Sequence, residues 1–66
     1  MRVVVNGQPM EIREGLTLAD LLRELGVRPA YTGVALNREV ARKASYATTV
    51  LRQGDQVEIV HPMAGG

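Results

Sequence analysis

The stretch LTLADLLRELG, residues 16–26, decides the fold, because it reads as an amphipathic helix with both ends marked. Thr17 is a favoured N-cap, and Asp20 follows three residues later, where an acid completes a capping box and suits the helix dipole. Leucines with the i, i+3, i+4, i+7 spacing of one apolar face stand at positions 18, 21, 22 and 25. Gly26 supplies a C-terminal cap. The sequence therefore predicts one short helix with a single buried face.

Strand-like segments stand on both sides of this helix. Residues 1–5 and 10–13 flank Asn6-Gly7, a strong hairpin signal because both residues tolerate positive φ. The later segments predicted as strands are 34–36, a short return at Val40, 50–52 and 56–60, with an irregular connection at 41–49. This order predicts an α+β two-layer domain whose last strand lies centrally, near the first. It resembles the β-grasp, or ubiquitin-like, architecture: a mixed sheet of four to five strands packed on one main helix.

Length and composition exclude several classes of protein. The chain has 66 residues, eight basic and seven acidic, with a net charge of +1, two aromatic residues and no cysteine. One small core leaves little room for a deep active-site cleft, which favours a binding module or carrier. The sequence has neither the basic face nor the stacking aromatic residues that nucleic-acid binding needs. Without cysteine, the chain can form no disulfide bond and perform no thiol chemistry. The longest N-terminal apolar run, residues 3–5, is too short for a membrane span. We expect a cytoplasmic protein that is monomeric alone.

The end of the chain is the predicted working part. We expect residues 1–61 to form the domain and residues 62–66 a flexible tail, because Pro62 cannot donate to a strand ladder. Glycine has no Cβ, so Gly65 and Gly66 fit a narrow enzyme channel. A carboxylate becomes electrophilic once its oxygen is made a good leaving group, for instance by adenylation. Gly66 is therefore the predicted site at which the adenylate is attached. Met63, Ala64 and Gly65 are predicted to let Gly66 reach the enzyme's channel and to fit into that channel. The alternative is a frayed terminus, which glycines also favour.

Strand alternation predicts a second functional surface. The residues expected to face the helix are Val3, Val5, Val57 and Ile59. Those expected on the open sheet face are Arg2, Val4, Glu58 and Val60. The two valines of this open face would form a small apolar patch near the root of the tail, rimmed by charge, where a partner docks. The alternative is that they are ordinary surface valines.

No side chain of the domain is predicted to be catalytic. His61 is the single histidine, and without cysteine it has no companions for a metal site. Asp20 and Glu24 lie four residues apart and resemble a pair of catalytic carboxylates. A helix cap and a solvated helix face explain them better. We expect no bound cofactor and no bound metal.

The chain as a whole resembles the sulfur carriers of thiamine biosynthesis, the ThiS family. The segments that carry this resemblance are Val5-Asn6-Gly7, Leu18-Ala19-Asp20-Leu21-Leu22, Val34-Ala35-Leu36-Asn37, residues 54–61 and Ala64-Gly65-Gly66. One departure is Ala41, where family members often carry proline.

The resemblance implies a mechanism and a set of partners. A ThiF-type enzyme would use ATP to adenylate Gly66, and sulfur from a cysteine desulfurase relay would replace AMP, leaving a thiocarboxylate. Thiazole synthase would then take the sulfur, so the chain would be a cosubstrate and no enzyme. The alternatives are a sulfur carrier for another pathway (molybdopterin or tRNA thiolation), a ubiquitin-like protein modifier, or a plain interaction domain.

Overall fold

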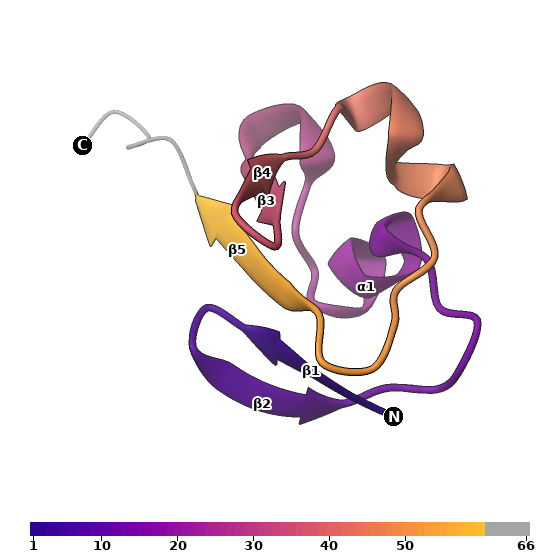
Figure 1. Ribbon diagram of the computed structural model, residues 1–66. Helices are drawn as coiled ribbons and strands as arrows, with labels where there is room; N and C mark the ends of the chain where they lie inside the picture. The colour runs from indigo at the N-terminus through magenta and orange to yellow at the C-terminus, as the bar shows by residue number, and fades with distance from the viewer. Residues whose placement is uncertain (61–66) are drawn as a thin grey trace.

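The computed structural model describes residues 1–60, which form one mixed five-stranded sheet with a single α-helix packed on it (Figure 1). The strands are β1 (Arg2–Val5), β2 (Gln8–Glu11), β3 (Gly33–Leu36), β4 (Glu39–Val40) and β5 (Gln56–Val60). The helix is α1 (Leu18–Glu24), and two 3-10 turns are η1 (Pro29–Tyr31) and η2 (Lys43–Thr48). The spatial order of the strands is β2-β1-β5-β3-β4. The predicted α+β arrangement is confirmed.

The first hairpin forms where Asn6-Gly7 predicts it. Asn6 has φ 49° and Gly7 has φ 80°, the left-handed pair that a two-residue hairpin turn requires. The strand β2 therefore starts at Gln8, directly after the turn and two residues before the predicted return strand. The Asn6 side chain also ties the turn to β5, because its Oδ1 accepts a hydrogen bond from the Ile59 N–H at 2.8 Å.

The last strand, β5, is the centre of the sheet, as predicted. It runs parallel to β1, with Val4 opposite Gln56, and antiparallel to β3, with Gly33 opposite Val60. Val57 and Ile59 of β5 are buried, and the residues that alternate with them (Gln56, Glu58 and Val60) are exposed. Because the neighbours of β5 pair with both of its edges, a change in its register would displace the whole core.

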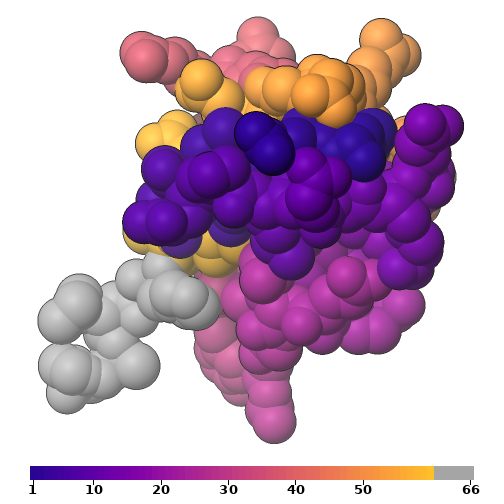
Figure 2. Space-filling model, turned by 90° about the horizontal axis from the view of Figure 1, so that it is seen from below, coloured from indigo at the N-terminus to yellow at the C-terminus, as the bar shows by residue number. Residues whose placement is uncertain are grey.

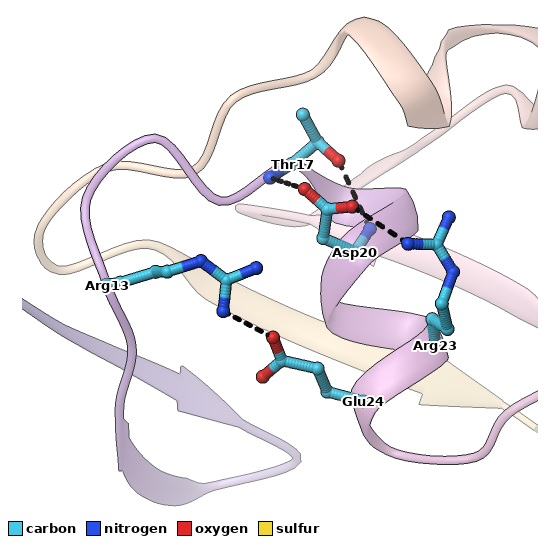
Figure 3. Close-up of polar contacts among 5 residues, drawn as sticks. All are labelled: Arg13, Thr17, Asp20, Arg23 and Glu24. Atoms are coloured by element: carbon cyan, nitrogen blue, oxygen red, sulfur yellow. Dashed lines mark hydrogen bonds and ion pairs between the residues drawn. The ribbon is translucent and has the colours of Figure 1, made fainter.

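The helix begins and ends as its sequence indicates. The Thr17 Oγ1 accepts from the Asp20 N–H at 3.1 Å, and the Asp20 carboxylate accepts from the Thr17 N–H at 3.2 Å, so the capping box is complete (Figure 3). Three leucines of the predicted apolar face, Leu18, Leu21 and Leu22, are buried. The fourth, Leu25, is 38% exposed, so the predicted stripe is one residue too long.

The position of the helix end explains this difference. Leu25 is already the C-cap residue, and Gly26 follows with φ 73°. The Val27 N–H then donates to the Leu22 carbonyl at 2.9 Å, which closes the turn that ends the helix before a further apolar residue can join its buried face.

The predicted strand at residues 50–52 is wrong. Val50 makes only an isolated bridge with Thr17, and the Leu51 N–H donates to the Leu16 carbonyl at 2.9 Å. The segment thus pairs with the loop that leads into α1 and has no place beside the other strands. Leu51 is still buried, at 2% exposure, which accounts for the strand-like apolar pattern.

The residues after this segment pack beside the first hairpin. Viewed from below, the indigo and purple atoms of the first hairpin lie against orange atoms of the chain that leads into β5 (Figure 2). The Gly54 N–H donates to the Arg2 carbonyl at 2.8 Å, and the Val4 N–H donates to the Asp55 carbonyl at 2.9 Å. These bonds lead the chain into β5 alongside β1.

The turn between β3 and β4 gives a stability prediction. Asn37 has φ 52° and Arg38 has φ 70°, a conformation that costs an L-residue about 1–2 kcal/mol and glycine almost nothing. Arg38→Gly is expected to stabilise the protein by about 0.5–1 kcal/mol, after the greater entropy of the unfolded glycine chain is offset. Urea unfolding measures the gain. Arg38→Ala is the matched control, since it removes the same side chain and keeps the strained φ; an equal gain in both variants would contradict the explanation.

Candidate functional site

The predicted attachment residue lies beyond the part of the chain that the structure describes. Gly66, Gly65, Ala64 and Met63 all fall outside residues 1–60, as does the predicted boundary between domain and tail at residues 61 and 62. Their roles stay predictions. The structure does place Val60, the residue at which the described chain ends, and with it the surface from which the predicted tail starts.

Val60 ends the central strand on its open face. Its neighbour Ile59 is buried, so alternation directs the Val60 side chain away from the helix, where it is 63% exposed. Glu58 is exposed on the same face and lies opposite Ala35, while Val60 lies opposite Gly33. Two of the four predicted docking residues therefore lie together at this end of the sheet.

The other two predicted docking residues lie elsewhere. Val4 is level with Gln56 of the parallel strand, four residues before Val60, which separates them by about 13 Å along the sheet. Arg2 is two residues farther away and forms an ion pair with Glu11, Nε to Oε1, at 3.2 Å. Val4 is half-buried. The four residues share a face, but the structure does not bring them into one patch at the root of the tail.

One residue that the sequence did not single out lies beside Val60. Gly33 is its partner in the β3–β5 ladder, and Tyr31 precedes Gly33 by two residues and is 66% exposed. The other tyrosine, Tyr46, is buried at 4% exposure, so only one of the two aromatic rings is accessible. No local signal marks Gly33 as a neighbour of Val60, since the pairing of β3 with β5 joins segments about 25 residues apart.

The two helix carboxylates have structural roles. Hydrogen bonds from the backbone and then the side chain of Thr17 lower the pKa of Asp20, and the charges of Arg23 and Arg13 add to this effect. Glu24 forms an ion pair with Arg13, Oε2 to Nη1, at 2.7 Å (Figure 3). The prediction that Asp20 is a helix cap is confirmed, and each of the two acids forms an ion pair with an arginine.

The lowered pKa of Asp20 gives a pH prediction. A carboxyl whose pKa is lower in the folded state stabilises the fold fully above its unfolded value, and loses that contribution as the pH falls through the folded value. Below its ordinary pKa of 3.8, wild-type stability should therefore fall as Asp20 becomes protonated. Asp20→Asn should be less stable at neutral pH and lose less on acidification. Urea unfolding between pH 2 and pH 7 checks this, and parallel curves for the two proteins would contradict it.

The described residues offer no further chemical centre. Across residues 1–60 no three metal-ligating side chains gather, no pocket is found, and every buried side-chain nitrogen or oxygen has a hydrogen-bond partner. None of the helices in this part of the chain is both long enough and apolar enough to cross a membrane. What the described domain presents is a surface next to Val60, the residue after which the predicted tail begins.

Comparisons with known proteins identify what this arrangement is similar to. The family model of the ThiS family matches residues 3–66. The sulfur carrier protein ThiS of Escherichia coli is 30% identical over 66 residues, covering 100% of both chains. The crystal structure of a thiamine biosynthesis protein (ThiS) from Geobacter metallireducens has a TM-score of 0.86 at 36% identity, with 100% of both chains covered. This likeness confirms the predicted β-grasp fold.

Longer proteins also contain a segment of this kind. Two proteins called thiazole synthase, from Magnetococcus marinus and Paramagnetospirillum magneticum, are each 38% identical over 66 residues. The match covers 100% of this chain and 20% of each of them, so the chain spans about a fifth of their length.

Proposed function

The chain belongs to the ThiS family, and on this premise we propose that it carries sulfur for thiamine biosynthesis as a thiocarboxylate on Gly66. The observation that carries the proposal is that the family match continues past residue 60, the last that the structure describes, to residue 66. The likeness to the Escherichia coli carrier also extends over the full length of both chains. The matches thus take in the described domain together with the segment that holds Ala64, Gly65 and Gly66.

The chemistry would take place in partner enzymes. An oxygen of the Gly66 carboxylate attacks the α-phosphorus of ATP and pyrophosphate leaves, giving an acyl adenylate. The terminal sulfur of a donor persulfide then attacks the acyl carbon and AMP leaves, giving an acyl disulfide. A second thiol attacks the donor cysteine's sulfur, so that the thiocarboxylate leaves on Gly66 and a disulfide forms on the donor. A ThiF-type enzyme would supply the ATP site, and a cysteine desulfurase relay the sulfur. In this scheme the chain binds no cofactor and acts as a cosubstrate in the cytoplasm.

The domain's part is to present the acyl carbon. Because the two terminal glycines have no side chains, ATP and the sulfur donor could both approach the acyl carbon of Gly66 closely. Close positioning of reacting groups raises the rate of a reaction strongly. The described domain supports a presenting role, because its buried side chains form one apolar core and its open sheet face is free of the helix. The tail would start from that face.

We further propose thiazole synthase as the sulfur acceptor. The support is that a segment 38% identical to this chain occurs within two proteins of that name. Joining a carrier to its acceptor in one chain raises the effective concentration of one for the other. This chain would meet the same kind of enzyme as a separate molecule.

Intact-mass measurement tests the carrier function. The protein is incubated with a ThiF-type enzyme, ATP and a sulfur source, and wild type is expected to gain the mass of sulfur in place of one oxygen. Omission of ATP is the control and should leave the mass unchanged. A ubiquitin-like modifier would instead form high-mass adducts with other proteins, and an unchanged mass in the complete mixture would contradict the proposal.

A further inference from the structure

The two edges of β5 are paired over different lengths. On one edge, β3 pairs with β5 as far as Val60, which lies opposite Gly33. On the other edge, the ladder with β1 ends at Val5 opposite Val57, because the chain leaves β1 at the first hairpin turn. The last three residues of β5, 58–60, are therefore not paired with any residue of β1.

One backbone N–H in these last residues points toward the edge where β1 has ended. The Val57 carbonyl accepts a hydrogen bond from the Asn6 N–H at 2.8 Å, so the backbone groups of Val57 face the first hairpin. This orientation repeats at every second residue of a strand, so the Ile59 N–H faces the same edge. Ile59 is buried at 8% exposure, and a buried N–H without an acceptor is costly.

The side chain of Asn6 supplies the acceptor that β1 does not. Its Oδ1 accepts from the Ile59 N–H at 2.8 Å, in a partly buried contact between residues 53 positions apart in the sequence. Asn6 is itself fixed, because its own N–H is bonded to Val57 and its φ of 49° belongs to the two-residue turn. In Figure 1 this turn lies at the same, left-hand end of the sheet as the arrowhead of β5. A fixed side chain thus holds the strand one residue before Val60.

We infer that Asn6 is a positioning residue for the reaction at Gly66, because it sets the direction in which β5 delivers the chain to the adenylating enzyme. The inference rests on the proposed function. Asn6 touches no reacting atom and acts through Ile59. With the bond in place, every free molecule presents the end of β5 in one orientation. Without it, only the β3 edge holds residues 58–60, and the apparent affinity of the enzyme falls with the fraction of molecules still correctly oriented.

A second asparagine provides a matched control on the same strand. Asn37 also lies in a two-residue turn with a left-handed φ, 52°, and its Oδ1 accepts from the Gln56 N–H at 2.9 Å. Asn37 therefore holds the first residue of β5, whereas Asn6 holds the residue before the last. A general loosening of β5 should follow from the loss of either side chain. A change in the direction of its end should follow only from the loss of Asn6.

Amide hydrogen exchange tests the contact in the free protein. Asn6→Gly removes the acceptor and keeps a residue that favours the turn. The Ile59 N–H should then exchange about two- to tenfold faster, the change in an equilibrium that the loss of one such hydrogen bond produces. Asn6→Asp keeps an oxygen acceptor in an Asp-Gly turn and should exchange at nearly the wild-type rate. Equal rates in wild type and Asn6→Gly would overturn the inference, since the strand end would be held without Asn6.

Adenylation kinetics separate positioning from stability. The KM for the carrier in pyrophosphate release should rise about two- to tenfold in Asn6→Gly, with kcat at saturating carrier unchanged. Asn6→Asp should restore the KM, and Asn37→Gly should leave it at the wild-type value. The assay is run where urea unfolding shows all variants to be folded, so a loss of stability alone would not change the KM. Equal rises in Asn6→Gly and Asn37→Gly would contradict the positioning role.

The same assay separates this inference from the proposed function. If wild type releases no pyrophosphate with the enzyme and ATP, the proposed function is wrong and the inference falls with it. If wild type reacts and Asn6→Gly has the same KM, the carrier function stands and the positioning role is wrong. If Asn6→Gly lowers kcat and leaves KM unchanged, Asn6 acts after binding, which also contradicts the inference.

Discussion

Deletion of Gly66 is expected to abolish formation of the thiocarboxylate while leaving the fold intact. Shortening the chain withdraws the carboxylate by one residue from the position where ATP and sulfur must meet it. Misplacement of a reacting group by about 1 Å can reduce a rate about a hundredfold, so a loss of at least that size is expected. Intact mass after incubation with the activating enzyme, ATP and the sulfur source measures the product.

Two control variants separate length from composition. Ala64→Gly keeps the number of residues and should still be loaded, because it changes only one small side chain in the tail. Addition of one glycine after Gly66 should impair loading as the deletion does, since it moves the carboxylate the other way. Circular dichroism should be the same for all of these proteins, because the core consists of residues between Val3 and Ile59. Normal loading of the deletion variant would rule out Gly66 as the attachment site.

Leu22→Ala is expected to unfold a large fraction of the protein. Leu22 has no exposed surface and lies at the centre of the helix face that packs on the sheet. Truncating such a leucine to alanine typically costs about 2–5 kcal/mol, through lost burial and the cavity left behind. A core of this size rarely supplies more than about 3–5 kcal/mol in total, so the substitution removes most of the stability. Urea unfolding followed by circular dichroism measures the change.

Leu25→Ala is the matched control for this prediction. Leu25 is also a leucine, and its spacing in the sequence predicts the same helix face as Leu22. It is nevertheless 38% exposed and stands at the C-cap. We expect it to cost less than about 1.5 kcal/mol, because much of its side chain stays in water in the folded protein. Equal losses for the two variants would contradict the burial that the structure shows.

Features that depend on neighbouring residues could be predicted from the sequence. The capping box needs only Thr17 and Asp20 three residues apart, and both of its hydrogen bonds are present. The Asn6-Gly7 turn likewise forms with positive φ at both positions. In each case the interactions that stabilise the feature are made by residues close together in the sequence. The packing of the rest of the chain therefore has little effect on whether the feature forms.

Features that depend on distant residues could not be predicted in the same way. Leu51 has an apolar strand-like context, but its backbone partner is Leu16, in the loop before the helix. The predicted docking residues share a face because alternation is local, yet the register between β1 and β5 separates Val4 from Val60. The same non-local pairing brings Gly33 beside Val60. Part of the candidate site is therefore set by register, which the sequence does not reveal.

Transfer of labelled sulfur tests the central claim most directly. The protein is loaded with a heavy sulfur isotope, separated from the donor, and given to thiazole synthase with its other substrates and an excess of unlabelled sulfide. If the chain is the sulfur carrier, the thiazole product should contain the heavy isotope in a single turnover, and the carrier should return to its carboxylate mass. A product that contains only unlabelled sulfur, with the label still on the carrier, would contradict the claim.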